Sequence, residues 1–217
     1  MRNGSSNSLE EQVFLQLEED ILSGFYKSGE SLTELAISAR LGVSRTPVRS
    51  ALHRLAEEGL VSIAPNKGAV VIGVTNDDLI DTYKIRIRLE GLASAMATAR
   101  LSEKDKRELT AMVELSEFYV SKEDTEHLRE LDSAFHEIIY RASGNRMLTK
   151  ILIELHRNIR AYRKRALEVP GRLAESVSEH REILNAMLEG DAALADELTS
   201  RHVERAMENA LKMSQNG

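Results

Sequence analysis

The sequence predicts a mainly α-helical protein with two parts, and three observations lead to this prediction. Apolar residues recur along most of the 217 residues at the three- and four-residue spacing of amphipathic helices. Two short β-prone runs flank Pro65-Asn66-Lys67-Gly68, and no strand is expected from Thr75 onward. Hydrophobic residues make up 42% and charged residues 29% of the chain, with 3 Pro and 12 Gly, which is the composition of a folded protein.

The N-terminal part begins with two predicted helices. Residues 1–7 are small and polar, and we expect a disordered tail there. Ser8-Leu9-Glu10-Glu11 has the pattern of a capping box, and the helix that follows ends at Gly24. Thr33 is the expected N-cap of a short second helix that runs to about Arg40.

A third helix and a hairpin complete this part. Ser44-Arg45-Thr46-Pro47 starts the helix, because Pro in the first turn loses no hydrogen bond, and Gly59 ends it. The runs 60–64 and 69–74 then pair as a hairpin. Two short helices across a tight turn, followed by a hairpin, are typical of a winged helix-turn-helix domain, which we assign to residues 8–75.

In such a domain the first residues of the second helix of the motif face base edges in the DNA major groove. Arg45, Thr46 and Arg49 supply the polar and cationic side chains that this position requires. Lys67 at the hairpin tip is placed to reach the backbone or the minor groove. The net charge of the chain is −6, which argues against general adhesion to nucleic acid, but residues 36–74 hold five basic and only two acidic side chains.

The C-terminal part, residues 76–217, is predicted to be an antiparallel all-α bundle of about six helices with short connections. The expected helical blocks are 76–100, 102–121, 123–143, 145–168, 172–189 and 191–213.

Four side chains that can bind metal lie on the predicted inner faces of three of these helices. Asp132 and His136 are four residues apart, a spacing that directs both side chains to one point. His180 and His202 lie within the apolar stripes of two later helices. A lone inward His is more often a core residue, but three His and one Asp are a common ligand set for a divalent transition metal. The chain has no Cys; we expect zinc in the purified protein, with nickel, manganese or iron as alternatives.

A family resemblance rests on four stretches of the N-terminal part. They are Leu41-Gly42-Val43-Ser44-Arg45-Thr46-Pro47-Val48-Arg49, Ala51-Leu52, Leu55 and Glu58-Gly59-Leu60-Val61. This segment resembles the DNA-binding domain of the GntR family of bacterial transcription regulators, although Ser50 stands where the family usually has Glu. The resemblance implies that Arg45, Thr46 and Arg49 read the operator and that Asn66, Lys67 and Gly68 form the wing.

The C-terminal part is similar to the metal-binding version of the FCD domain, the effector domain of the FadR subfamily of GntR regulators. The similarity rests on Asp132-x-x-x-His136, Ser178-Glu179-His180, His202 and Arg86-x-x-Leu89-Glu90. Six helices are more like the shorter VanR-type group than the seven-helix group. The resemblance spans about residues 9–210 and implies a small carboxylate effector held between Arg86 and the metal.

Arg86 has a second interpretation. It lies within the apolar stripe of its helix, and a buried guanidinium needs an anion, which Glu90 one turn later also supplies as a structural pair. Asn158 is expected on an inner face with Ile151 and is a weaker candidate for the effector pocket. The remaining histidines, His53, His127 and His156, are interpreted as surface or structural.

These features predict a cytoplasmic bacterial regulator, by default a repressor, whose affinity for a palindromic operator is controlled by a small organic acid at a metal site. We expect a homodimer, since a palindromic operator suits one half-site per subunit. We expect no membrane association, because no apolar run is long enough to span a bilayer and no signal peptide is present. Two alternatives remain: a metal-dependent enzyme that uses the His and Asp ligands, which we reject as the main interpretation, and a regulator with a purely structural metal.

Overall fold

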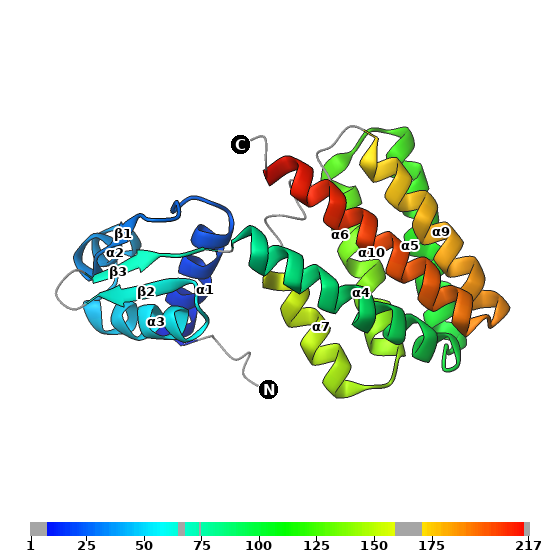
Figure 1. The fold of residues 1–217 in the computed structure, drawn as a ribbon, viewed down its shortest axis with the longest axis horizontal. Coiled ribbons are helices and arrows are strands. Elements are labelled where there is room, and N and C mark those ends of the chain that lie inside the picture. Colours follow the sequence, from blue (N-terminus) through cyan, green and yellow to red (C-terminus); the bar gives the residue numbers. More distant parts are fainter. Residues whose placement is uncertain (1–7, 65–67, 74, 159–170, 215–217) are drawn as a thin grey trace, which may run out of the picture. The chain divides into compact units, whose positions relative to one another are not determined.

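The computed structural model describes residues 8–64, 68–73, 75–158 and 171–214, and the chain divides into two compact units, Met1–Thr75 and Asn76–Gly217 (Figure 1). The fold is mainly α-helical, as the sequence predicts. The residues expected to form the N-terminal tail, 1–7, lie outside the described part of the chain.

The N-terminal unit contains three helices and a small antiparallel sheet whose strand order is β1-β3-β2. The helices are α1 (Leu9–Leu22), α2 (Glu34–Leu41) and α3 (Arg45–Glu57), and the strands are β1 (Ser31–Leu32), β2 (Val61–Ala64) and β3 (Gly68–Val71). The hairpin β2–β3 pairs Val61 with Val71 and Ala64 with Gly68. This arrangement is the predicted winged helix-turn-helix.

The caps of these helices are formed by short polar side chains. The Ser8 hydroxyl accepts a hydrogen bond from the Glu11 amide, and the Thr33 hydroxyl accepts one from the Ala36 amide, both at 3.2 Å. Gly42 ends α2 in the left-handed conformation, with φ of 67°, which lets the chain turn sharply into α3. Helix α1 packs on α3, and Leu17 on α1 as well as Val48 and Leu55 on α3 are buried.

Strand β1 was not predicted from the sequence, in which only the hairpin runs 60–64 and 69–74 were identified as strands. Ser31 pairs with Val70 and Leu32 with Ala69, so β3 becomes the central strand. A run of two residues is too short to show the alternation that identifies a strand in a sequence.

The C-terminal unit is a bundle, and its helices match the six predicted blocks to within a few residues at each described end. They are α4 (Asn76–Thr98), α5 (Glu103–Ser121), α6 (Thr125–Ala142), α7 (Arg146–Asn158), α9 (Arg172–Glu189) and α10 (Ala192–Ser214). The second half of the predicted block 145–168 lies outside the described residues. Helix α4 packs along α10, while α5 packs against α6 and α9 (Figure 1).

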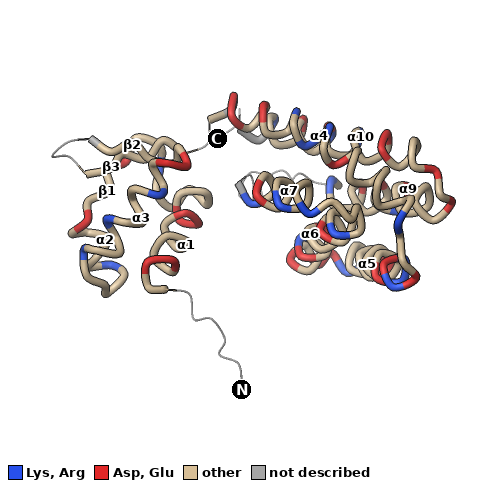
Figure 2. The backbone as a smooth tube through the Cα atoms, turned by 90° about the horizontal axis from the view of Figure 1, so that it is seen from below, with Lys and Arg blue, Asp and Glu red and all other residues tan. Residues whose placement is uncertain are grey.

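The bundle core is apolar, and the ligand candidates project into it from α6, α9 and α10. Phe135, Ile139, Ile183 and Leu184 are among its fully buried residues. Basic and acidic positions are interspersed along the helices (Figure 2). Among the described helices, none is both long enough and apolar enough to cross a membrane.

The inner face of α7 differs from the predicted one. Leu148, Leu152 and His156 are buried, whereas Ile151, which was expected on the inner face with Asn158, is 39% exposed. The apolar stripe of α7 is broad enough to include both the exposed Ile151 and the buried Leu148 and Leu152, so periodicity alone does not show which edge of the stripe is buried.

Candidate metal centre and DNA-binding residues

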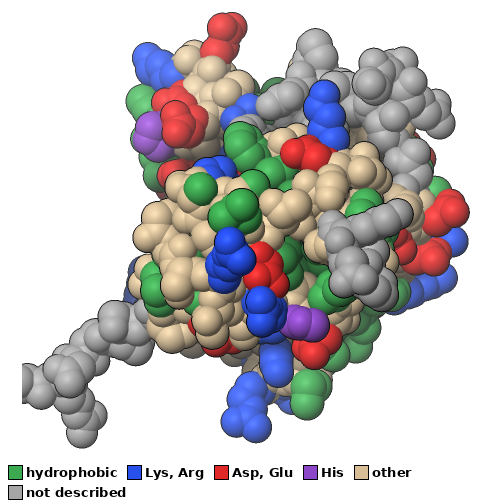
Figure 3. All heavy atoms as spheres, turned by 90° about the vertical axis from the view of Figure 1, so that its left-hand side faces the viewer, with side chains coloured by type: hydrophobic (Ala, Val, Ile, Leu, Met, Phe, Trp, Pro, Cys, Tyr) green, Lys and Arg blue, Asp and Glu red, His purple; other side chains and the backbone are tan. Residues whose placement is uncertain are grey.

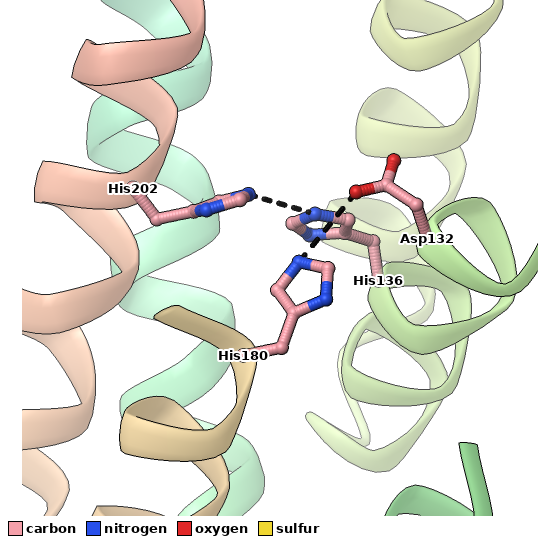
Figure 4. A group of neighbouring side chains, drawn as sticks. All are labelled: Asp132, His136, His180 and His202. Carbon is pink, nitrogen blue, oxygen red and sulfur yellow. Dashed lines mark hydrogen bonds and ion pairs between the residues drawn. The ribbon is translucent and has the colours of Figure 1, made fainter. Parts of the chain in front are cut away.

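The structure brings the four predicted ligand residues together in the interior of the bundle (Figure 4). Asp132 and His136 lie one turn apart on α6, His180 lies on α9 and His202 on α10, and all four side chains are buried. One ligand atom from each lies within 4.8 Å of the others. The convergence of three imidazoles and one carboxylate predicted from the sequence is therefore present in the fold.

The two imidazoles of His136 and His202 are held by carboxylates on their outer sides. His202 Nδ1 lies 2.6 Å from Glu179 Oε2, and His136 Nδ1 lies 3.0 Å from Glu90 Oε2. A ring that donates its Nδ1 proton to a carboxylate presents a bare lone pair at Nε2.

These Nε2 atoms face each other at a distance of 3.2 Å. At this distance the two atoms are joined either by a proton, as in an N–H···N hydrogen bond, or by a metal ion that binds both lone pairs. Zinc–nitrogen bonds of 2.0–2.1 Å in tetrahedral geometry place ligand atoms about 3.3 Å apart, and the observed separation fits that value. The donor set and its arrangement thus fit a divalent metal ion.

The other two ligand residues are also fixed by their neighbours. The His180 ring stacks on Phe135, with centroids 4.2 Å apart, and its Nε2 atom lies 3.6 Å from Asp132 Oδ1. The Ser176 hydroxyl donates a hydrogen bond to the same carboxylate oxygen. Burial lowers the pKa of His180 well below its usual range, and the neighbouring His202 adds to this effect. Burial likewise lowers the pKa of His202, so both rings favour the neutral form that binds metal.

Glu179, which directly precedes His180 on α9, is also part of the site. It is buried and accepts two hydrogen bonds from Arg172 at 3.0 and 2.8 Å, and one from Arg205 at 2.8 Å. Burial acts to raise the pKa of Glu179, but the hydrogen bonds from His202 and Arg172 outweigh it and hold the pKa well below its usual range. Glu179 is therefore an anion that orients His202.

Arg86 and Glu90 form a fully buried ion pair on α4. The guanidinium Nε and Nη2 atoms both lie within 2.7 Å of Glu90 Oε1, so the structural partner predicted from the sequence is present. Burial opposes the charge on each group, but the pair raises the pKa of Arg86 and lowers that of Glu90. Arg86 Nη1 is buried and has no hydrogen-bond partner among the described residues. Glu90 thus joins Arg86 to the ligand His136.

His156 is buried, not on the surface. Its Nδ1 atom lies 3.3 Å from the Tyr140 hydroxyl, and its ring centroid is 5.9 Å from that of His136. His156 thus lies beside His136 on the α7 side of the four ligand residues, in agreement with a structural role. The side chain of Asn158, the weaker pocket candidate, lies outside the described residues.

The predicted DNA-reading residues lie at the start of α3. Arg45, Thr46 and Arg49 are all exposed. Arg49 donates hydrogen bonds from Nε and Nη2 to the two carboxylate oxygens of Glu34 on α2, at 2.7 and 2.9 Å. Glu34 was not identified as a functional residue in the sequence, because nothing local links it to a residue fifteen positions later.

The predicted wing is described only in part. Asn66 and Lys67 lie outside the described residues. Gly68 opens β3 with φ of 79°, and a Cβ atom there would lie 2.5 Å from the Leu32 carbonyl oxygen, so only Gly fits.

The local excess of basic residues is largely neutralised within the N-terminal unit. Arg40 pairs with Asp20, and Arg54 pairs with Glu11, in addition to the pairing of Arg49 described above. Basic and acidic side chains lie next to one another on the face shown in Figure 3. The unit therefore presents individual cations and not a uniformly basic surface.

Each of the two units matches a known protein family. Residues 9–71 match the family described as bacterial regulatory proteins, gntR family, and residues 81–205 match the FCD domain. An uncharacterized HTH-type transcriptional regulator of Bacillus subtilis (strain 168), YdhC, is 32% identical over 213 residues, which are 95% of this chain and 92% of the relative. The gluconate operon transcriptional repressor of the same organism is 34% identical over 131 residues, which are 60% of this chain and 54% of the relative.

Solved structures show the same architecture. The structure of E. coli McbR/YncC superposes with a TM-score of 0.73 at 26% identity, and the match covers 97% of this chain and 99% of that one. The matching domains and relatives are those of transcription regulators and not of enzymes. The chain therefore belongs to the GntR family of bacterial regulatory proteins, and it is a DNA-binding transcription regulator with an FCD domain as its C-terminal unit.

Proposed function

We propose that this regulator is a metal-containing repressor whose affinity for its operator is controlled by a small organic acid. The facing Nε2 atoms of His136 and His202, 3.2 Å apart, carry the metal part of the proposal. Asp132, His136, His180 and His202 would hold the ion, and FCD domains often bind metal. Zinc suits this ligand set in the purified protein, with nickel, manganese or iron as alternatives in the cell.

At the DNA, Arg45, Thr46 and Arg49 would enter the major groove. An Arg side chain pairs with guanine through two hydrogen bonds, and a Thr hydroxyl contacts a phosphate or a base. Asn66, Lys67 and Gly68 would approach the DNA as the wing. One such unit per subunit suits a homodimer on a palindromic operator, with half-sites about 34 Å apart. A protein that binds the chromosome of a bacterium acts in the cytoplasm.

The effector would bind beside the metal. A bound ion supplies an electrophilic position that attracts a carboxylate. Arg86 contributes a buried guanidinium with one nitrogen, Nη1, that has no partner among the described residues. Glu90 keeps this guanidinium and His136 in place, so a ligand that contacts Arg86 also acts on a metal ligand.

Control of DNA binding would follow from thermodynamic linkage. If the acid binds the DNA-competent and DNA-incompetent arrangements with different affinities, operator affinity changes by the same factor that DNA changes acid affinity. Several related regulators are named as repressors, and the gluconate operon repressor is one of them. Loss of repression upon binding of the acid is therefore the response we propose.

A second candidate is a regulator with a purely structural metal. The observation that favours it is the Arg86–Glu90 ion pair, which already neutralises the charge of the guanidinium within the protein. In that case the ion would stabilise the bundle but transmit nothing to the DNA.

One experiment separates the two candidates. Operator fragments are first enriched from genomic DNA with the purified protein, and their affinity is then measured for metal-loaded and metal-stripped protein with a panel of small mono-, di- and hydroxycarboxylic acids. Our proposal predicts a shared palindrome and at least one acid that changes the affinity of the metal-loaded protein alone. Equal affinities under all these conditions, with folded protein, would overturn control by the acid and leave DNA binding intact.

A further inference from the structure

The contact between α2 and α3 in the N-terminal unit suggests a second determinant of operator specificity. Glu34 holds Arg49 through two parallel hydrogen bonds, Nε to Oε1 at 2.7 Å and Nη2 to Oε2 at 2.9 Å. The Arg49 side chain is 64% exposed and that of Glu34 is 28% exposed. An exposed ion pair adds little to stability, so stabilisation of the fold is a weak explanation for this geometry.

A count of hydrogen-bond donors shows what the pair leaves available. A guanidinium has five N–H donors in a planar fork, and Glu34 accepts one from Nε and one from Nη2. The second Nη2 proton and both Nη1 protons stay available on the opposite edge. Guanine is read through two acceptors, O6 and N7, by two donors of one guanidinium. The end of Arg49 that stays available has the donors that this contact requires.

The backbone holds both partners firmly. Glu34 is the first residue of α2, directly after the N-cap Thr33, whose side chain bonds the Ala36 amide. Arg49 lies one turn into α3, which packs on α1 and in which Val48 and Leu52 are buried. The hydrogen bond from Arg49 lowers the pKa of Glu34, and Arg45 adds to this, so the carboxylate is charged.

We propose that Glu34 is a positioning residue for operator recognition: it fixes the guanidinium of Arg49 so that the Nη1–Nη2 edge is presented to a guanine. This rests on the proposed role of Arg49 in reading the operator. Preorganisation reduces the conformational entropy lost upon binding the correct base pair. The Glu34 carboxylate also repels phosphates, which weakens binding to any sequence. Preorganisation therefore raises the ratio of operator affinity to non-specific affinity, whereas the repulsion lowers both affinities alike and leaves their ratio unchanged.

The test compares this ratio among full-length variants at one salt concentration. Glu34→Gln keeps the shape of the side chain but leaves it one hydrogen-bond acceptor and no charge. We expect the ratio of operator affinity to scrambled-DNA affinity to fall about tenfold in this variant. Glu57→Gln removes the same charge from the exposed last turn of α3 and should leave the ratio unchanged. Replacement of the contacted guanine by 7-deazaguanine should weaken binding of the unaltered protein and affect Glu34→Gln less.

A double variant shows whether Glu34 acts through Arg49. In the Arg49→Ala background, Glu34→Gln should cause no further loss in the ratio, and urea unfolding should show that each variant is folded. If Arg49→Ala lowers the ratio and Glu34→Gln does not, the positioning role is wrong while the DNA-reading role of Arg49 stands. If Arg49→Ala has no effect on operator affinity, the proposed role of Arg49 itself is wrong. An equal loss from Glu34→Gln with and without Arg49 would overturn the proposal in favour of a structural effect.

Discussion

His136 Nε2 and His202 Nε2 lie 3.2 Å apart, and each ring is held from its other nitrogen by a carboxylate, Glu90 for the first and Glu179 for the second. The two carboxylates select the tautomer in which both Nε2 lone pairs point inward. Without a metal, one of the two Nε2 atoms has to carry a proton to bond the other, whereas a metal ion binds both lone pairs directly. The arrangement connects the ligands on α6 and α10 to charged residues on α4 and α9.

Glu179→Gln should weaken metal binding about 10- to 100-fold, because the amide cannot replace the anion that orients His202. The dissociation constant is measured by competition with a chromophoric chelator. Glu182→Gln, three residues later on the same helix at an exposed position, serves as the control and should bind metal like the unaltered protein. Equal affinity in the Glu179 and Glu182 variants would show that the carboxylate does not orient the ligand.

Arg86→Gln should lower the free energy of unfolding by about 3–5 kcal/mol, because it leaves the buried Glu90 without its cation. Urea unfolding followed by circular dichroism measures the change. Arg88→Gln, on the exposed side of the same helix, should change stability by less than about 0.5 kcal/mol. A loss in the Arg86 variant no larger than that of the Arg88 variant would contradict the buried ion pair.

Gly68→Ala should destabilise the N-terminal unit more than Gly73→Ala. Both residues have positive φ, 79° and 71°, so both substitutions incur a conformational cost of about 1–2 kcal/mol. Only at position 68 would the new Cβ atom approach a backbone oxygen, that of Leu32, while nothing lies within 4 Å at position 73. Differential scanning calorimetry compares the two, and identical midpoints would show that β1 does not press against the wing strand.

Arg45→Ala should weaken binding to the operator by roughly tenfold to a hundredfold and leave metal content unchanged, because the side chain is exposed at the start of α3 in the separate N-terminal unit. Fluorescence anisotropy with labelled operator measures the affinity, and elemental analysis measures the metal. Operator affinity equal to that of the unaltered protein would remove Arg45 from the DNA-reading set.

The sequence predicted the helices and the inward positions of the four ligand residues because both follow from local periodicity. An apolar stripe places Asp132 and His136 inward on α6, and the same reasoning places His180 and His202 on their helices. The GntR and FCD resemblance was confirmed by the family matches.

The partners of those ligands could not be predicted in this way. Glu179 and His202 are 23 residues apart, and Glu90 and His136 are 46 apart, so each contact depends on how helices pack. The same limit applies to Glu34 and Arg49. Strand β1 and the buried face of α7 were missed for different reasons. A two-residue strand has no visible period, and the broad apolar stripe of α7 does not show which of its edges is buried.

The most direct test of a metal site in the bundle is isothermal titration calorimetry, in which zinc is added to chelator-treated protein. The unaltered chain and His202→Asn are compared. We expect the unaltered protein to bind one zinc ion per chain tightly enough to resist dialysis, and the variant to bind zinc with an affinity at least tenfold lower. The control His53→Asn, at an exposed position on α3, should bind zinc like the unaltered chain. Absence of stoichiometric zinc, nickel, manganese and iron binding to folded protein would contradict the account.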